Sequence, residues 1–115
     1  MIVGIAGGDA SNPEHLQIVD NYFEKLINCY DVYLFTVFSA GIEGIERTHP
    51  TLAQQYAKLR GLPCYHKDFK TFDKLVQGIC QRVDYLIILN DGTQYTKRLF
   101  MTYKQTDKHG SMIRL

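Results

Sequence analysis

Apolar residues along this chain gather in five short runs, and between the runs they recur every three or four positions. The runs cover residues 2–6, 32–38, 62–66, 85–89 and 111–115, and their length and β-branched content predict strands. The run YLIIL at 85–89 is apolar at every position, which is typical of a strand covered by helices on both faces.

The intervening segments predict four amphipathic helices. Pro13 suits the first position of a helix, and Gly61 suits the left-handed residue that follows a helix. The predicted helix boundaries, in chain order, are a cap at Ser11 or Asn12 with an apolar stripe ending at Tyr30, a start at Pro50, a cap at Thr71, and residues 95–106.

Strands that alternate with helices favour a parallel sheet joined by right-handed crossovers. The sequence therefore predicts one α/β domain over residues 1–115, a Rossmann-like three-layer sandwich with a mostly parallel five-stranded sheet. The commonest strand order for such a chain is 3-2-1-4-5. In that order strands 1 and 4 are neighbours, and their carboxyl ends flank the crevice where open α/β sheets bind ligands.

Composition narrows the classes of function. The 115 residues are 45% hydrophobic and 22% charged with a formal net charge of +1, so no basic footprint for long nucleic acid is expected. The sequence has no apolar stretch of membrane-spanning length and no signal-peptide pattern, so a cytoplasmic protein without a membrane partner is expected. The four histidines are scattered, so neither a metal site nor a cofactor is predicted.

The three cysteines are predicted to be reduced core residues, because they are far apart and lie in apolar surroundings. Cys64 offers one alternative. His66 lies two residues further on, and in a strand both side chains would share a face as a thiol and its base.

Two glycine turns follow the strands that are expected to be neighbours, and each leads into a helix N-terminus, where backbone N–H groups favour an anion. Hydroxyl groups and a lysine one helical turn from Thr93 add further donors. The same residues also suit a purely structural role as turn glycines and helix caps. The candidate ligand-binding residues of these two turns are Gly7, Gly8, Asp9, Ser11, Asp91, Gly92, Thr93 and Lys97.

The segment 39–49, predicted to be a loop after the second strand, is a third candidate. Gly41 and Gly44 would give it conformational freedom, and Glu43 and Glu46 would offer acceptors for ribose hydroxyls or a base edge. An ordinary surface connector fits the same residues equally well.

Three segments resemble the SLOG superfamily of Rossmann-like nucleotide-binding domains, which includes DNA-processing A-like and LOG-type proteins. They are IVGIAGGD, SAGIEGIERTHPTLAQQYAKLRGLPCY and VDYLIILNDGTQYTK, and with them the resemblance spans essentially the whole chain. In the middle segment Gly44, Glu46 and Ala53 look like the family pattern of a glycine and an acid before a helix that carries an alanine.

LOG-type hydrolases carry a P-G-G-x-G-T-x-x-E pattern whose glutamate serves N-glycosidic cleavage. Here the corresponding run ends at Thr96, which takes the place of that glutamate, and the prolyl-glycyl start is missing. A threonine cannot supply the charge or the base of a carboxylate at neutral pH. The resemblance therefore implies ligand binding more than hydrolysis.

Three hypotheses follow. The leading one is a non-catalytic module that binds or senses a nucleotide-like or phosphorylated small molecule. The alternative is an N-glycosidic hydrolase or transferase, similar to LOG-type enzymes or nucleoside deoxyribosyltransferases. The third is a protein-interaction domain, such as a homo-oligomer formed through a helix face or the edge strand 111–115. The candidate carboxylates for the enzyme are Asp9, Glu43, Glu46 and Asp91.

Overall fold

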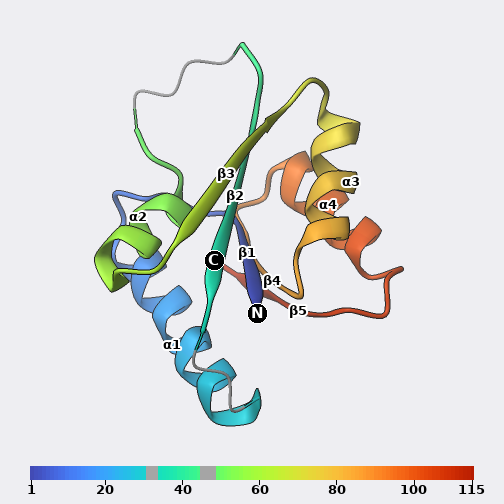
Figure 1. Cartoon of the computed structure of the whole chain (residues 1–115). Coiled ribbons are helices and arrows are strands. Elements are labelled where there is room, and N and C mark those ends of the chain that lie inside the picture. Colours follow the sequence, from blue (N-terminus) through green and yellow to red (C-terminus); the bar gives the residue numbers. More distant parts are fainter. Residues whose placement is uncertain (31–33, 45–48) are drawn as a thin grey trace.

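In the computed structural model, the described residues are 1–30, 34–44 and 49–115. Within them the chain forms a five-stranded, all-parallel sheet in the order β3-β2-β1-β4-β5, with four helices between the strands (Figure 1). The predicted Rossmann-like α/β fold and its strand order are therefore confirmed. The elements are β1 (Ile2–Gly7), α1 (Pro13–Tyr30), β2 (Thr36–Ile42), α2 (Leu52–Arg60), β3 (Cys64–Phe69), α3 (Phe72–Arg82), β4 (Tyr85–Asn90), α4 (Gln94–Tyr103) and β5 (His109–Arg114).

Helices cover both faces of the sheet, with α1 and α2 on one face and α3 and α4 on the other (Figure 1). Phe23 of α1 packs against Tyr56 of α2 with their ring centroids 4.8 Å apart. On the opposite face Leu99 of α4 is fully buried. Complete burial of a side chain of this size stabilises the fold by about 1.5–3 kcal/mol. The strands β1 and β4 contribute buried residues to both apolar clusters, so the centre of the sheet is the centre of the core.

The neighbouring strands β1 and β4 pair from Val3 and Tyr85 to Gly7 and Leu89. The chain reaches β2 on one side of this pair and β5 on the other, so the pair marks the switch point of the sheet. The turns that follow β1 and β4 therefore leave the sheet at the same edge and side by side.

The strand β2 begins and ends four residues later than the sequence pattern predicts. The segment 39–42 is strand, not the start of a loop, and the predicted residues 32 and 33 lie outside the described part of the chain. Leu34 is 84% exposed in spite of its apolar side chain, whereas Ser39 is buried. The cause is the pairing with β3, which runs without interruption from Val37 to Ile42 and carries the strand past the apolar run.

Other boundaries shift by a few residues for similar reasons. The strand β3 extends to Phe69, which is buried under α3 and is paired with Ile42. The helix α2 begins at Leu52 rather than at Pro50, because Thr51 caps it. The last helix and strand cover Gln94–Tyr103 and His109–Arg114, where the pattern predicted 95–106 and 111–115.

The starts of α1 and α3 and the end of α2 lie where the sequence predicts them. The helix α1 begins at Pro13, and Asn12 accepts a hydrogen bond from the Glu14 amide. Thr71 caps α3, and Gly61 follows α2 with a φ of 67°. A hydroxyl cap of this kind stabilises a helix by about 1 kcal/mol.

The prediction that all three cysteines are core residues is wrong for two of them. Cys80 is buried, but Cys29 at the end of α1 and Cys64 at the start of the edge strand β3 are exposed. Cys29 lies one residue before the end of α1, and Cys64 begins a strand that has a neighbour on one side only. Among the described helices, none has the length and apolar character that a membrane crossing requires.

Candidate functional site

A cavity of about 460 Å³ opens at the carboxyl edge of the sheet, where the turns after β1 and β4 meet the end of β2 and the start of α2. Its volume is in the range of small-molecule sites. Candidate residues from both predicted turns line it, so the two turns share one crevice. The lining residues are Ile5, Ala6, Gly7, Gly8, Asp9, Ala10, Ser39, Ala40, His49, Pro50, Thr51, Leu52, Asp91 and Tyr95.

Gly7 and Gly8 hold the turn after β1 close to its neighbours. Both have positive φ, 77° and 76°, which side-chain-bearing residues rarely adopt. A Cβ on Gly7 would lie 2.1 Å from the Leu89 carbonyl oxygen, and one on Gly8 would lie 2.8 Å from Leu52 Cδ2. These glycines therefore have a structural role as well as a place in the crevice wall.

Asp9 organises the turn that leads into α1. Its Oδ1 accepts hydrogen bonds from the Ser11 backbone N–H at 2.9 Å and from Ser11 Oγ at 2.7 Å. The bond from the Ser11 backbone is the main reason that the pKa of Asp9 is lowered. Asp9 is thus a carboxylate at neutral pH, and the Ser11 hydroxyl already donates to it.

Asp91 has the same role before α4. Its Oδ1 accepts from the Thr93 backbone N–H at 3.1 Å and from Thr93 Oγ1 at 2.6 Å. Burial alone would raise the pKa of Asp91, but the hydrogen bonds from Thr93 and Thr96 outweigh it and lower the pKa. The Gly92 amide donates to Asn90 Oδ1 at 3.0 Å. The donors of residues 92 and 93 are therefore largely used within the turn.

These contacts make the crevice rich in acceptors. Asp9 and Asp91 are both anionic, and the described residues that line the cavity include no lysine or arginine. Lys97 lies in α4 and does not line it. Hydrogen-bond donors on a ligand, such as sugar hydroxyls or amino groups, match this wall better than a bare phosphate at residues 91–93.

The candidates of the third predicted segment are not gathered in the crevice. Gly41 lies within β2 instead of in a loop, for the pairing reason given above. Gly44 has a φ of 82°, and among the described residues no atom lies within 4 Å of where its Cβ would be. Glu43 is exposed, and its amide donates to the Phe69 carbonyl. Glu46 lies outside the described residues.

Thr96 of α4 does not line the cavity. Its side chain is fully buried, and its hydroxyl lies 3.1 Å from the Thr93 carbonyl oxygen and 3.3 Å from Asp91 Oδ1, so the two acceptors share its proton. Its methyl group is one of the atoms that a Cβ on Gly7 would strike, at 2.9 Å. The residue fills a tight space between β1 and α4.

A chain of hydrogen-bonded side chains that the sequence analysis did not predict lies beside the crevice. Ser39 Oγ lies 2.8 Å from both Thr51 Oγ1 and His66 Nδ1, and His66 Nε2 lies 2.8 Å from Asp68 Oδ1. His66 therefore pairs with Ser39 and Asp68 and not with Cys64, whose thiol has its pKa raised by desolvation. A His-x-Asp spacing on one strand face is the signal that could have suggested part of it.

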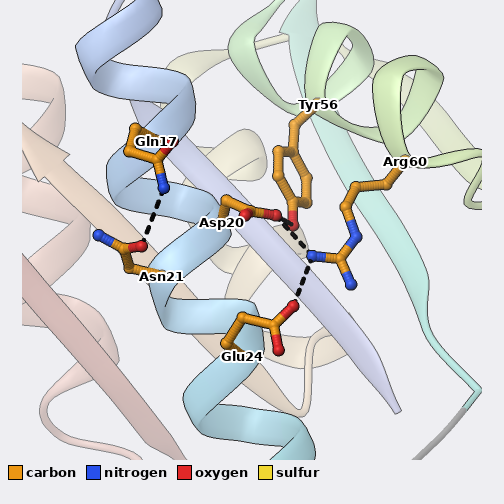
Figure 2. Close-up of polar contacts among 6 residues, drawn as sticks. All are labelled: Gln17, Asp20, Asn21, Glu24, Tyr56 and Arg60. Atoms are coloured by element: carbon orange, nitrogen blue, oxygen red, sulfur yellow. Dashed lines mark hydrogen bonds and ion pairs between the residues drawn. The ribbon is translucent and has the colours of Figure 1, made fainter.

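The helix α2, whose N-terminus lines the crevice, is fixed to α1 by a polar cluster (Figure 2). Asp20 Oδ1 accepts from Tyr56 Oη at 2.8 Å and from the Arg60 guanidinium at 2.5 Å. Arg60 also reaches Glu24 at 3.0 Å. The bond from Arg60 is the main cause of the lowered pKa of Asp20. On the exposed side of α1, Gln17 donates to Asn21 at 3.0 Å.

In the part of the chain that the structure describes, histidine, cysteine and carboxylate side chains form no group of three or more that could hold a metal ion. No protein-family model matches the sequence, and no curated protein matches it either. The site must therefore be interpreted from its own geometry.

Proposed function

We propose that this chain binds a small nucleotide-derived molecule in the crevice at the switch point of its sheet. The observation that carries the proposal is that the turns after β1 and β4, far apart in the sequence, line one cavity of ligand size. Ligands of open α/β sheets bind at this place. The resemblance to SLOG domains agrees with a nucleotide-derived ligand.

The lining residues suggest how such a ligand would lie. Asp9 and Asp91 would accept hydrogen bonds from sugar hydroxyls or from the amino group of a base. The half-buried ring of Tyr95 would provide an aromatic wall for the base. The turn after β1 leads into α1, and backbone N–H groups at this helix N-terminus would be the donors for a phosphate.

The test is a thermal-shift and calorimetric screen of nucleosides, nucleoside mono-, di- and triphosphates, and dinucleotides against the whole chain. A ligand at a hundred times its Kd should stabilise the protein by about 2.7 kcal/mol. Ala10→Phe, which fills the crevice wall, should abolish the shift. The proposal fails if no compound in the panel raises the melting temperature, or if this variant responds like wild type.

A charge variant adds a matched comparison. Asp9→Asn keeps an oxygen that can accept from Ser11, so the turn should persist while the negative charge is lost. Asp107→Asn makes the same change at an exposed position outside the cavity. We expect ligand affinity to fall only for Asp9→Asn, and equal affinities for the two variants would contradict the proposed contact.

One observation favours a second candidate, cleavage or transfer at an N-glycosidic bond. Two anionic carboxylates, Asp9 and Asp91, line the same cavity, and such a reaction needs a carboxylate at the anomeric carbon. Release of free base from nucleosides or nucleoside monophosphates, lost in Asp9→Asn or Asp91→Asn, would establish it. Binding without base release across the panel would leave the non-catalytic function.

A further inference from the structure

Four side chains from β2, β3 and the N-cap of α2 form one unbroken chain of hydrogen bonds at the edge of the crevice. Thr51 and Ser39 are linked through their hydroxyl oxygens, Ser39 is linked to His66 Nδ1, and His66 Nε2 is linked to Asp68, with each of the three distances 2.8 Å. Ser39 is only 1% exposed, and both Ser39 and Thr51 line the cavity. This chain of hydrogen bonds therefore connects the exposed Asp68 carboxylate with the crevice wall.

The direction of the chain follows from the donor and acceptor capacity of each group. The Asp68 carboxylate can only accept, so His66 Nε2 carries the proton, and in the neutral imidazole Nδ1 is then an acceptor. Ser39 must donate its single hydroxyl proton to Nδ1. The Thr51 hydroxyl must in turn donate to Ser39. Each proton in the chain therefore points away from the crevice and toward Asp68.

Thr51 is left with only acceptor capacity toward the cavity. Its hydroxyl proton is used on Ser39, and its Oγ1 also accepts from the Gln54 amide at 3.1 Å as the cap of α2. A hydroxyl oxygen has two lone pairs, so one remains to accept from a ligand. The anionic Asp9 lines the same cavity, so Thr51 and Asp9 together offer oxygen acceptors to a ligand.

We propose that His66 and Asp68 are positioning residues that fix Thr51 as an acceptor, so that this wall recognises a hydrogen-bond-donating part of the ligand. The matching chemistry is a sugar hydroxyl or an exocyclic amine, and a phosphate is disfavoured there. This inference rests on the proposed function for the ligand itself, but the hydrogen-bond direction is a property of the free protein and can be tested separately.

An independent feature of the fold supports a built arrangement. Gly41 lies opposite Asp68 in the register of β2 and β3, and a Cβ at Gly41 would come within 2.5 Å of Asp68 Oδ1. A glycine inside a strand weakens the strand, so its presence needs a local reason. Here the missing side chain leaves the space in which Asp68 reaches His66.

The first experiment observes the imidazole of His66 by nitrogen-15 NMR in the free protein at neutral pH. The proposal requires the neutral tautomer with the proton on Nε2 and an unprotonated Nδ1. In Gly41→Ala, which crowds Asp68, the preference for this tautomer should weaken. A proton on Nδ1 in wild type, in either the other tautomer or the imidazolium, would reverse the chain and overturn the proposal.

The second experiment compares adenosine with its N6,N6-dimethyl and its 2′,3′-di-O-methyl derivatives by calorimetry. Wild type should lose about three- to tenfold in affinity when the donor that faces Thr51 is methylated. In Ser39→Ala the Thr51 hydroxyl no longer donates to residue 39 and can turn its proton into the crevice. The ratio of the affinity for adenosine to the affinity for the methylated compound should therefore shrink toward one. A ratio that is unchanged in Ser39→Ala, or equal affinities of wild type for all three compounds, would refute the acceptor wall.

The two experiments separate the two proposals. If no compound binds but His66 carries its proton on Nε2, the proposed ligand class is wrong and the hydrogen-bond chain stands. If adenosine binds but His66 is protonated on Nδ1, the ligand class stands and this inference is wrong. Should Ser39→Ala fail to fold, Asp68→Ala removes the exposed end of the chain and should also reduce the ratio.

Discussion

Gly41 and Asp68 lie opposite each other on neighbouring strands, and the Asp68 carboxylate occupies the space where a Gly41 side chain would be. The same carboxylate accepts a hydrogen bond from His66, which reaches Ser39 at the crevice. The sequence pattern predicted that Gly41 lies in a loop. Instead it lies in β2 and leaves the space that these hydrogen-bonded side chains occupy.

The first prediction concerns this pair. Gly41→Ala should break the hydrogen bond between His66 and Asp68, because the flexible carboxylate must move away from the new Cβ. We expect the free energy of unfolding in urea to fall by about 1 kcal/mol. In a protein that already carries Asp68→Ala, Gly41→Ala should cause almost no further loss of stability. The double variant should therefore be no less stable than Asp68→Ala alone. Additive losses would show that Gly41 has another role.

The second prediction compares two glycines with the same backbone conformation but different surroundings. Gly7 has a φ of 77° and Gly92 has a φ of 82°. A Cβ at Gly7 would strike the Leu89 backbone, whereas a Cβ at Gly92 would meet no atom of residues 1–30, 34–44 or 49–115 within 4 Å. Gly92→Ala should lose about 1 kcal/mol from the left-handed conformation alone, and Gly7→Ala about 3 kcal/mol or more once crowding is added. Equal losses in urea denaturation would rule out the crowding.

The third prediction concerns the capping of α4. Thr93→Ala removes the N-cap side chain and its hydroxyl donor to Asp91, so stability should fall by about 1 kcal/mol and the pKa of Asp91 should rise toward its ordinary value. The backbone N–H of residue 93 remains as a donor, so the rise should be partial. Carbon-13 NMR titration of Asp91 measures the pKa.

The matched control is Thr71→Ala, which removes the cap of α3. It should cause a similar loss of stability with no change in the titration of Asp91. A shift of Asp91 in both variants would mean that the effect is global and not local to the turn.

The fourth prediction is a pH dependence of the contact between α1 and α2. The pKa of Asp20 is lowered in the folded protein from its ordinary value of 3.8, first of all by Arg60. The stabilisation from this carboxylate is therefore fully present above about pH 3.8 and is lost as the pH falls through the lowered folded-state pKa. Because Asp20 and Arg60 are each about one-third exposed, the effect should be about 1 kcal/mol or less.

Arg60→Met should flatten this part of the curve of stability against pH. Lys58→Met makes the same change of charge on the same helix, at an exposed residue outside the cluster, and should leave the curve as in wild type. Identical curves for the two variants would show that net charge, and not the pair with Asp20, controls the acid response.

Much of the fold follows from local patterns in the sequence. The apolar run at 85–89 matches β4, and the caps at Thr71 and Thr93 begin α3 and α4. These features depend on residues close together along the chain. Because crossovers between parallel strands are almost always right-handed, few strand orders were compatible with this sequence of elements. The structure has the commonest of them, β3-β2-β1-β4-β5. Because this order makes β1 and β4 neighbours, Gly7, Gly8 and Asp9 line one cavity together with Asp91.

Contacts between distant residues decided the rest. The apolar run at 32–38 favoured an early strand, but pairing with β3 moved β2 to Thr36–Ile42 and buried Ser39. The expected donors Ser11 and Thr93 were found to donate to Asp9 and Asp91, which changes the crevice from donor-rich to acceptor-rich. The spacing of apolar residues along the sequence does not indicate which side-chain atoms come into contact in the folded protein.

The sequence by itself determined the alternation of strands and helices, the glycine turns and most helix caps, because each is set by the conformational preferences of a few adjacent residues. The tertiary structure alone decided the register of β2 against β3 and the meeting of Ser39 with His66 and Asp68. Register is fixed by the sum of many weak contacts along two strands, and a shift of one residue turns every side chain to the other face.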